Sequence, residues 1–145
     1  MRKAGLFARL FAFIIDGFAL SILSSIISFI IIVIADIDIS LSNDHFSVIS
    51  NSASGLLAIT IVLLEFLYFG FLWSFYGKTI GMSLFHIKVV RKDGSYPGFL
   101  RAGLRGTLGY WISGLILGLG YIWAAFDSDR QAWHDKIFDT FVIES

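Results

Sequence analysis

Cysteine is absent from the 145-residue sequence. Disulfide bonds, thiol nucleophiles and thiolate metal sites are therefore excluded. Charge is also scarce, because Asp, Glu, Lys and Arg make up only 15% of the residues, whereas about 25% is usual in a soluble domain. With 57% hydrophobic residues and a mean hydropathy of +0.80, this shortage of charge indicates an integral membrane protein.

Three apolar runs are long enough to form membrane helices. The first, about residues 10–35, follows a basic N-terminus, but it is too long for the apolar part of a signal peptide and lacks a small-residue cleavage site. The second covers about residues 55–76, and the third, residues 104–126, is rich in glycine. The sequence therefore predicts an all-α polytopic membrane protein with a single domain, residues 1–145.

The basic residues are distributed unevenly between the segments that connect these runs. Residues 36–54 contain three aspartates and no Lys or Arg, whereas residues 77–105 hold six of the eleven basic residues. By the positive-inside rule, the N-terminus and the loop 77–103 are cytoplasmic and the loop 36–54 is external. We expect a multi-pass protein of the cytoplasmic (inner) membrane.

The third apolar run has two interpretations. Tyr110 and Trp111 on one side and Tyr121 and Trp123 on the other are symmetric about the glycines of 114–118. On a straight helix these aromatic pairs would be only about 15 Å apart, too close to mark opposite membrane surfaces. We prefer a broken, re-entrant hairpin that returns the tail 127–145 to the cytoplasm. The alternative is a third full span, which would place this tail outside.

Two short segments have the composition of β-strands. Residues 85–90 alternate in polarity before a Lys-Asp-Gly-Ser turn, and residues 140–144 (TFVIE) are also β-prone. An isolated strand is unstable in water. We therefore expect these segments to pair in a small cytoplasmic two-stranded sheet, which again requires the tail to be inside.

A carboxylate lies at the expected midplane of the second run. Glu65 is ten residues beyond Gly55, or about 15 Å inside the boundary. The first run carries a helical stripe of four serines, two of them at the same depth: Ser21, Ser24, Ser25 and Ser28. Two interpretations stay open: an intramembrane ion or proton site formed by Glu65 and these hydroxyls, or close helix packing in which a protonated Glu65 hydrogen-bonds across.

Opposite charges also interrupt the first run near its inner end. Counting about 20 residues inward from Ala35 places Asp16 near the cytoplasmic boundary, and Arg9 lies about 10 Å further along the same face. Arg9 can extend to the lipid headgroups. An acid facing lipid at this depth gains nothing from anionic headgroups, so Asp16 is expected to contact protein.

The remaining polar groups do not form a recognisable catalytic motif. His134 and Asp135 are adjacent in sequence and do not face one another on a helix, so with Asp139 they make a weak metal pattern. No nucleophile–base set, phosphate-binding glycine loop or dinucleotide fingerprint appears. We expect no enzymatic activity, no cofactor, no metal and no nucleic-acid partner.

Two longer motifs are more specific. They are GKTIGMSLFHIKVVRKDG at residues 77–94 and RQAWHDKIFDT at residues 130–140. Together with the Arg9/Asp16 pattern and the Arg101/Arg105 pair, they resemble the RDD family of membrane proteins over nearly the whole chain.

The sequence departs from the family's pattern at two positions. Ile80 stands where proline is frequent in the family, and Met82 stands where a basic residue is common. Glu65 lies outside the family's motifs, so any role for it is particular to this protein.

The resemblance implies that Arg9, Asp16 and Asp135 are the arginine and two aspartates for which the family is named. We expect Asp135 to contact Arg9, and Asp16 to contact Arg105 or Arg101, with His134 beside this network.

The resemblance also implies a choice of functions. Transport of a small ligand, or exchange of a monovalent cation for protons, would depend on Glu65 and the serines. The alternative is a non-catalytic protein that regulates another membrane protein through its cytoplasmic loop and tail. Three short apolar segments hardly enclose a path alone, so transport implies a homo-oligomer in the lipid bilayer.

Overall fold

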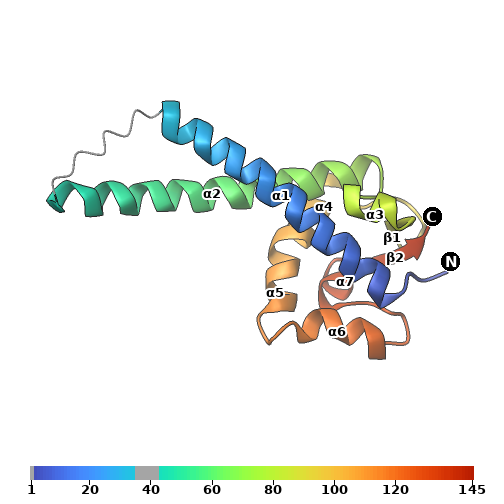
Figure 1. Cartoon of the computed structure of the whole chain (residues 1–145). Helices are drawn as coiled ribbons and strands as arrows, with labels where there is room; N and C mark the ends of the chain where they lie inside the picture. Colours follow the sequence, from blue (N-terminus) through green and yellow to red (C-terminus); the bar gives the residue numbers. More distant parts are fainter. Residues whose placement is uncertain (1, 35–42) are drawn as a thin grey trace.

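A computed structural model describes residues 2–34 and 43–145, with side chains described for 2–30 and 55–145. Two long helices extend away from a group of short helices and strands, and both chain termini lie in this group (Figure 1). The polar sites described below are formed where the long helices meet the short elements.

The two long helices are α1 (Leu6–Ile34) and α2 (Asn43–Phe75). Their apolar parts, Leu6–Ile30 and Gly55–Phe75, are each long enough to cross a membrane. At 1.5 Å per residue, even the shorter part extends about 31 Å, which matches the hydrocarbon thickness of a bilayer. The prediction of two membrane-crossing helices agrees with these lengths.

The predicted external loop, residues 36–54, is wrong in its second half. Helix α2 already begins at Asn43, and residues 35–42 lie outside the described residues. The polar Asn and Ser residues of 43–54 lower the intrinsic helix propensity of this part of α2. Extending a helix that already exists adds one hydrogen bond per residue fixed, so α2 can continue beyond its apolar part.

The segment predicted as a basic loop contains regular structure. After α2 come α3 (Ile80–Leu84), β1 (Ile87–Arg91) and α4 (Phe99–Leu104). Strand β1 pairs antiparallel with β2 (Thr140–Glu144), as the sequence predicted. The strand begins at Ile87 rather than Phe85, because Phe85 ends α3 and His86 has a φ of +51°, which turns the chain.

The N-terminal residues lie along the free edge of β2. Ala4 N–H donates to the Val142 carbonyl at 3.0 Å, and Glu144 N–H donates to the Arg2 carbonyl at 3.0 Å. The start and the end of the chain are therefore bound to one another at the same end of the molecule (Figure 1).

The third apolar run is broken. A helical segment of three parts, α4, the π-helix η1 (Arg105–Gly109) and α5 (Tyr110–Gly114), meets α6 (Leu119–Phe126) at an angle of 92°. Gly118, with a φ of +75°, lies at the break, where glycine has no steric penalty. The predicted break at the glycines 114–118 is confirmed, and the bend fits either a re-entrant hairpin or a broken third span.

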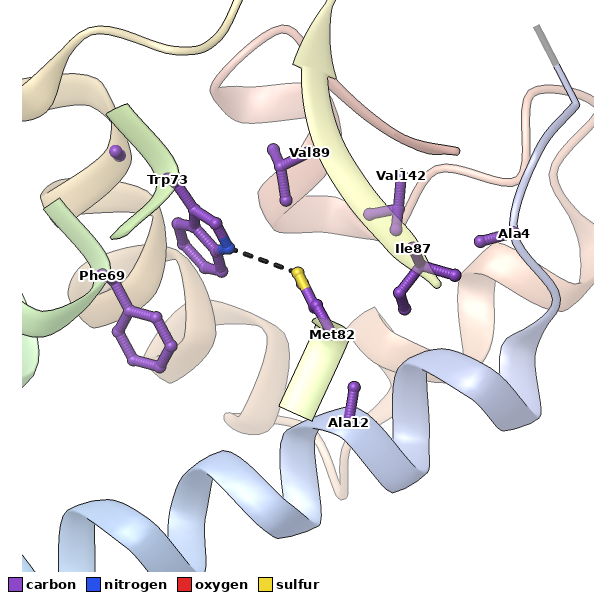
Figure 2. Packing of buried hydrophobic residues seen from close by; sticks show 9 residues of the cluster. Ala4, Ala12, Phe69, Trp73, Met82, Ile87, Val89 and Val142 are labelled. Carbon is purple, nitrogen blue, oxygen red and sulfur yellow. Dashed lines mark hydrogen bonds between the residues drawn. The ribbon is translucent and has the colours of Figure 1, made fainter. Parts of the chain in front are cut away.

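A small apolar core connects α1, the end of α2, α3 and the sheet. Met82 lies between the ring of Trp73 and the side chain of Ile87, and the Trp73 indole N–H points to its sulfur at 3.3 Å (Figure 2). Ala12 on α1 is fully buried beneath this methionine (Figure 2). The core thus fixes the inner half of α1 against α3, where the charged residues of α1 are found.

Candidate functional site

Asp135 is the centre of a buried group of charges. It lies in α7 (Trp133–Ile137), and its side chain is 0% exposed. Arg9 of α1 donates to its Oδ2 at 3.0 Å, and Arg105 of η1 donates to its Oδ1 at 2.5 Å. The Ala132 N–H also donates to Oδ2, at 3.1 Å, so the carboxylate caps its own helix. We call Arg9, Arg105 and Asp135 the charged cluster.

Arg105 is the more enclosed of the two arginines. Its side chain is 1% exposed, and its guanidinium carbon lies 4.3 Å from the centre of the Trp73 ring. Its Nε also donates to the Thr140 hydroxyl at 3.0 Å. The π-helix places this arginine beside α7, and such single π turns are frequent at functional sites.

His134 lies against the charged cluster without adding charge to it. Burial lowers the pKa of His134 to about 3, despite the attraction of Asp135. Its Nδ1 lies 2.9 Å from the Ser113 hydroxyl, and that hydroxyl accepts from the His134 N–H at 3.2 Å. A neutral ring whose Nδ1 accepts from Ser113 carries its proton on Nε2, the atom 3.7 Å from Asp135 Oδ1.

The arginines keep Asp135 ionised. Burial alone raises the pKa of the Asp135 carboxyl, but the charges of its basic neighbours, Arg105 above all, lower it to about 2. The charged cluster therefore carries two positive charges and one negative charge.

Asp16 forms a separate site with neutral donors. It is 3% exposed, and its oxygens accept from the Tyr68 hydroxyl at 2.8 Å, the Thr79 hydroxyl at 2.5 Å and the Gly81 N–H at 2.8 Å. Thr79 is the N-cap of α3, so the carboxylate meets the unpaired N–H groups of a helix start.

Close packing of α3 against α1 makes this contact geometrically feasible. A Cβ at Gly81 would lie 2.2 Å from the Ala12 carbonyl oxygen, so only glycine fits there. Ala12 and Asp16 are four residues apart on one face of α1. The second glycine of the GKTIG motif thus has a local physical role in this chain: it lets the start of α3 reach Asp16.

The predicted contact between Asp16 and Arg105 or Arg101 is wrong. Arg105 is bound to Asp135, and Arg101 lies at the edge, where it donates to the Phe138 carbonyl at 3.3 Å and is 3.7 Å from the exposed Asp139. Oppositely charged side chains were the expected partners of Asp16, whereas the start of α3 supplies neutral N–H and O–H donors. The predicted contact between Arg9 and Asp135 is present.

Glu65 faces a different cavity, of about 370 Å³, between α1, α2, α5 and α6. Glu65 is the central residue of the Gly55–Phe75 span. Other polar groups of the lining are Ser21, Ser24, Tyr110 and Tyr121. We call this space the polar cavity. Within the described part of the chain, no group forms a hydrogen bond or ion pair with the Glu65 carboxylate.

Three hydroxyl groups that line the polar cavity donate hydrogen bonds to backbone carbonyls. Ser21 donates to the Phe18 carbonyl at 2.8 Å, Ser24 donates to the Ser21 carbonyl at 3.0 Å, and Tyr121 donates to the Tyr110 carbonyl at 3.0 Å. A hydroxyl has only one proton, so these oxygens retain lone pairs as acceptors. Ser25 and Ser28 do not belong to the described lining.

Sequence reasoning missed several neutral partners of the charged side chains: Tyr68, Thr79, Ser113 and Thr140. A signal existed for Thr79 alone, because a threonine before a short helix is typical of an N-cap. The others become partners only through tertiary contacts. No group of three metal-binding side chains occurs among the described residues.

Two long apolar helices with buried charges at the end where the termini meet define a small helical membrane protein. The model of the RDD family matches residues 3–139, nearly the whole chain, and the chain belongs to this family. No curated protein and no solved structure matches it significantly.

Proposed function

We propose that this RDD-family protein exchanges a monovalent cation for protons across the membrane, with Glu65 as the binding carboxylate. The observation that carries the proposal is the polar cavity, which is lined by Ser21, Ser24 and a carboxylate at the centre of the span that has no partner among the described residues. Ionisable side chains in the membrane interior are costly and typically mark ion or proton pathways.

The chemistry of the lining favours a cation over an anion. Three hydroxyl groups donate hydrogen bonds to backbone carbonyls, so their oxygen lone pairs are available to the cavity. Oxygen atoms are the ligands that hard cations prefer. A proton and a cation cannot occupy the one carboxylate together, so competition for Glu65 couples their movements.

Flux measurements in liposomes test this proposal. Purified protein is reconstituted with a pH-sensitive dye inside the vesicles, and a Na⁺ or K⁺ gradient is imposed. We expect cation-dependent proton movement that falls at least tenfold in Glu65→Gln, because a side-chain amide is neither protonated nor deprotonated near neutral pH. Ser21→Ala with Ser24→Ala should weaken cation dependence with less effect on the maximal rate.

The matched control is Glu144→Gln, the same chemical change at an exposed residue that forms an ion pair with Arg2 at the chain ends. It should leave flux unchanged. No cation-dependent proton movement in the unaltered protein, or equal flux in Glu65→Gln, would contradict the proposal.

We also propose that both termini are cytoplasmic in the cell membrane, with α5 and α6 as a re-entrant hairpin. Supporting this topology are the 92° break and the hydrogen bonds between the chain ends. Because the natural sequence has no cysteine, a single cysteine replacing Ser145 can be labelled from either side. Labelling from outside would refute the hairpin.

A second candidate function is regulation of another membrane protein. A groove of about 750 Å³ lies where the end of β1 and the residue Phe141 of β2 meet the segment 129–139. Three basic and three acidic residues line it: Arg91, Lys92, Lys136, Asp93, Asp129 and Asp139. Such mixed charge suits a polar protein segment. A partner cross-linked at Lys92 and lost on charge reversal at Asp93, in a protein without flux, would favour this candidate.

A further inference from the structure

A second cavity, of about 280 Å³, adjoins the charged cluster and is separate from Glu65. It lies between the inner part of α1, the helix α6 and the strand β2. Arg9 and Arg105 contribute to its lining, and the rest is largely apolar. We call it the apolar cavity.

The charged cluster beside this cavity has one positive charge too many. Two guanidiniums share the single carboxylate of Asp135, and His134 is neutral because burial lowers its pKa to about 3. Arg105 is 1% exposed, so its charge is desolvated. A buried charge without a counter-charge is strongly unfavourable.

Some hydrogen-bond donors of the two arginines also lack an acceptor. Among the described residues, Arg9 Nε and Arg105 Nη1 are buried and have no partner. Buried donors in native proteins nearly always have a partner, so such a pair needs an explanation. An anion with several acceptor oxygens would satisfy both the surplus charge and these donors. Arginine forks fit phosphate oxygens especially well.

The apolar part of the lining indicates what carries the anion. It includes Leu10, Phe13 and Ile122, which are 48%, 40% and 46% exposed. Leu10 and Phe13 belong to the part of α1 that is long and apolar enough to cross a membrane, and exposed apolar side chains in such a part suit contact with lipid. A free hydrated ion gains nothing from contact with apolar side chains, whereas an acyl chain would pack against them.

We propose that the apolar cavity binds an anionic phospholipid. The phosphate contacts Arg9 and Arg105 and balances the charged cluster, and an acyl chain lies along Leu10, Phe13 and Ile122. The lipid acts as a structural ligand that completes the end of the molecule where the chain termini meet.

Soluble short-chain probes test the proposal with purified protein in a non-ionic detergent. The probes are dihexanoyl phosphatidylglycerol, dihexanoyl phosphatidylcholine and inorganic phosphate, and the readouts are thermal unfolding and native mass spectrometry. We expect the phosphatidylglycerol to bind at least tenfold more tightly than the phosphatidylcholine and to raise the unfolding temperature. Equal binding of the two lipids, or an equal effect of inorganic phosphate alone, would overturn the proposal.

Two variants locate the site. Ile122→Trp places a larger side chain in the lining of the apolar cavity and leaves both arginines intact. Phosphatidylglycerol should therefore bind at least tenfold more weakly. Its control, Leu115→Trp, changes an apolar residue that is 78% exposed and outside the cavity, and binding should not change. Arg9→Lys keeps the charge but removes the fork, and the preference for phosphatidylglycerol should fall. If Arg9→Lys does not fold, Ile122→Trp still decides: binding equal to that of the unaltered protein overturns the assignment.

Discussion

The charged cluster and the polar cavity solve the problem of a buried carboxylate in opposite ways. Asp135 is enclosed by two guanidiniums and a backbone N–H, so all its interactions are made within the fold. Glu65 has no partner among the described residues and faces a cavity instead. Asp135, whose oxygens are bonded within the fold, therefore acts as a structural element, whereas the Glu65 carboxylate is available to a ligand.

Asp16 belongs to the first kind despite having no cationic partner. Its three donors are neutral, and they come from the end of α2 and the start of α3. Arg9 and Asp135 are thus joined in one cluster, whereas Asp16 supports a neighbouring helix start.

Removing the central carboxylate should have the largest effect. Asp135→Ala leaves Arg105 and Arg9 buried without a counter-charge, and we expect a loss on the order of 3–5 kcal/mol in the free energy of unfolding. Denaturant unfolding in detergent measures it. The control is Asp139→Ala, an exposed partner of Arg101, which should cost about 0–1 kcal/mol.

The same comparison can be made as a double-mutant cycle. Arg9→Ala combined with Asp135→Ala should cost less than the two single losses together, because the second change removes a charge that the first left unpaired. Strict additivity would mean that the contact between Arg9 and Asp135 contributes nothing.

Acid should destabilise the charged cluster next in order. The folded pKa of Asp135 is lowered to about 2 from an ordinary value of 3.8, so its contribution is fully present above about pH 4 and is lost as the pH falls toward 2. A shift of this size corresponds to about 2 kcal/mol. His134, with a pKa lowered to about 3, has the same sign, and its contribution begins to fall near pH 6.5.

Unfolding measured from pH 7 to pH 3 checks this dependence. Stability should decline already below about pH 6.5, and His134→Gln should remove the part of the decline above about pH 5. A flat profile between pH 6.5 and pH 5 in the unaltered protein would contradict a buried, neutral His134.

Asp16→Asn should have an intermediate effect. The amide that replaces one oxygen points a donor toward donors, and we expect a loss of about 1–3 kcal/mol. Asp93→Asn, at an exposed residue, is the matched control. A loss equal to that of Asp135→Ala would mean that the neutral donors hold Asp16 as strongly as arginines hold Asp135.

Glu65→Gln should change stability least. Because the carboxylate has no described partner, removal of its charge should leave the unfolding free energy within about 0.5 kcal/mol of the unaltered protein, or raise it. A loss above about 2 kcal/mol would show that Glu65 is bonded within the fold, and it would place Glu65 beside Asp135 in the comparison.

Patterns along the chain predicted much of the fold and part of the sites. The apolar runs, the break at the glycines 114–118 and the pairing of β1 with β2 were all readable, because each follows from local composition and short-range periodicity. The contact of Arg9 with Asp135 was expected from the family resemblance. The partner of Asp16 was not, since hydroxyl and N–H donors are too common in a sequence to single out.

Hydropathy and residue counting along the chain were sufficient to indicate the class of protein, its two long apolar segments and the central position of Glu65 in the second of them. Which charges meet depends on the packing of distant segments. Arg105 reaches Asp135 because a π-helix and α7 pack together, and Asp16 meets α3 because glycine at position 81 lets two backbones touch. Such contacts depend on distances between segments that no local pattern encodes.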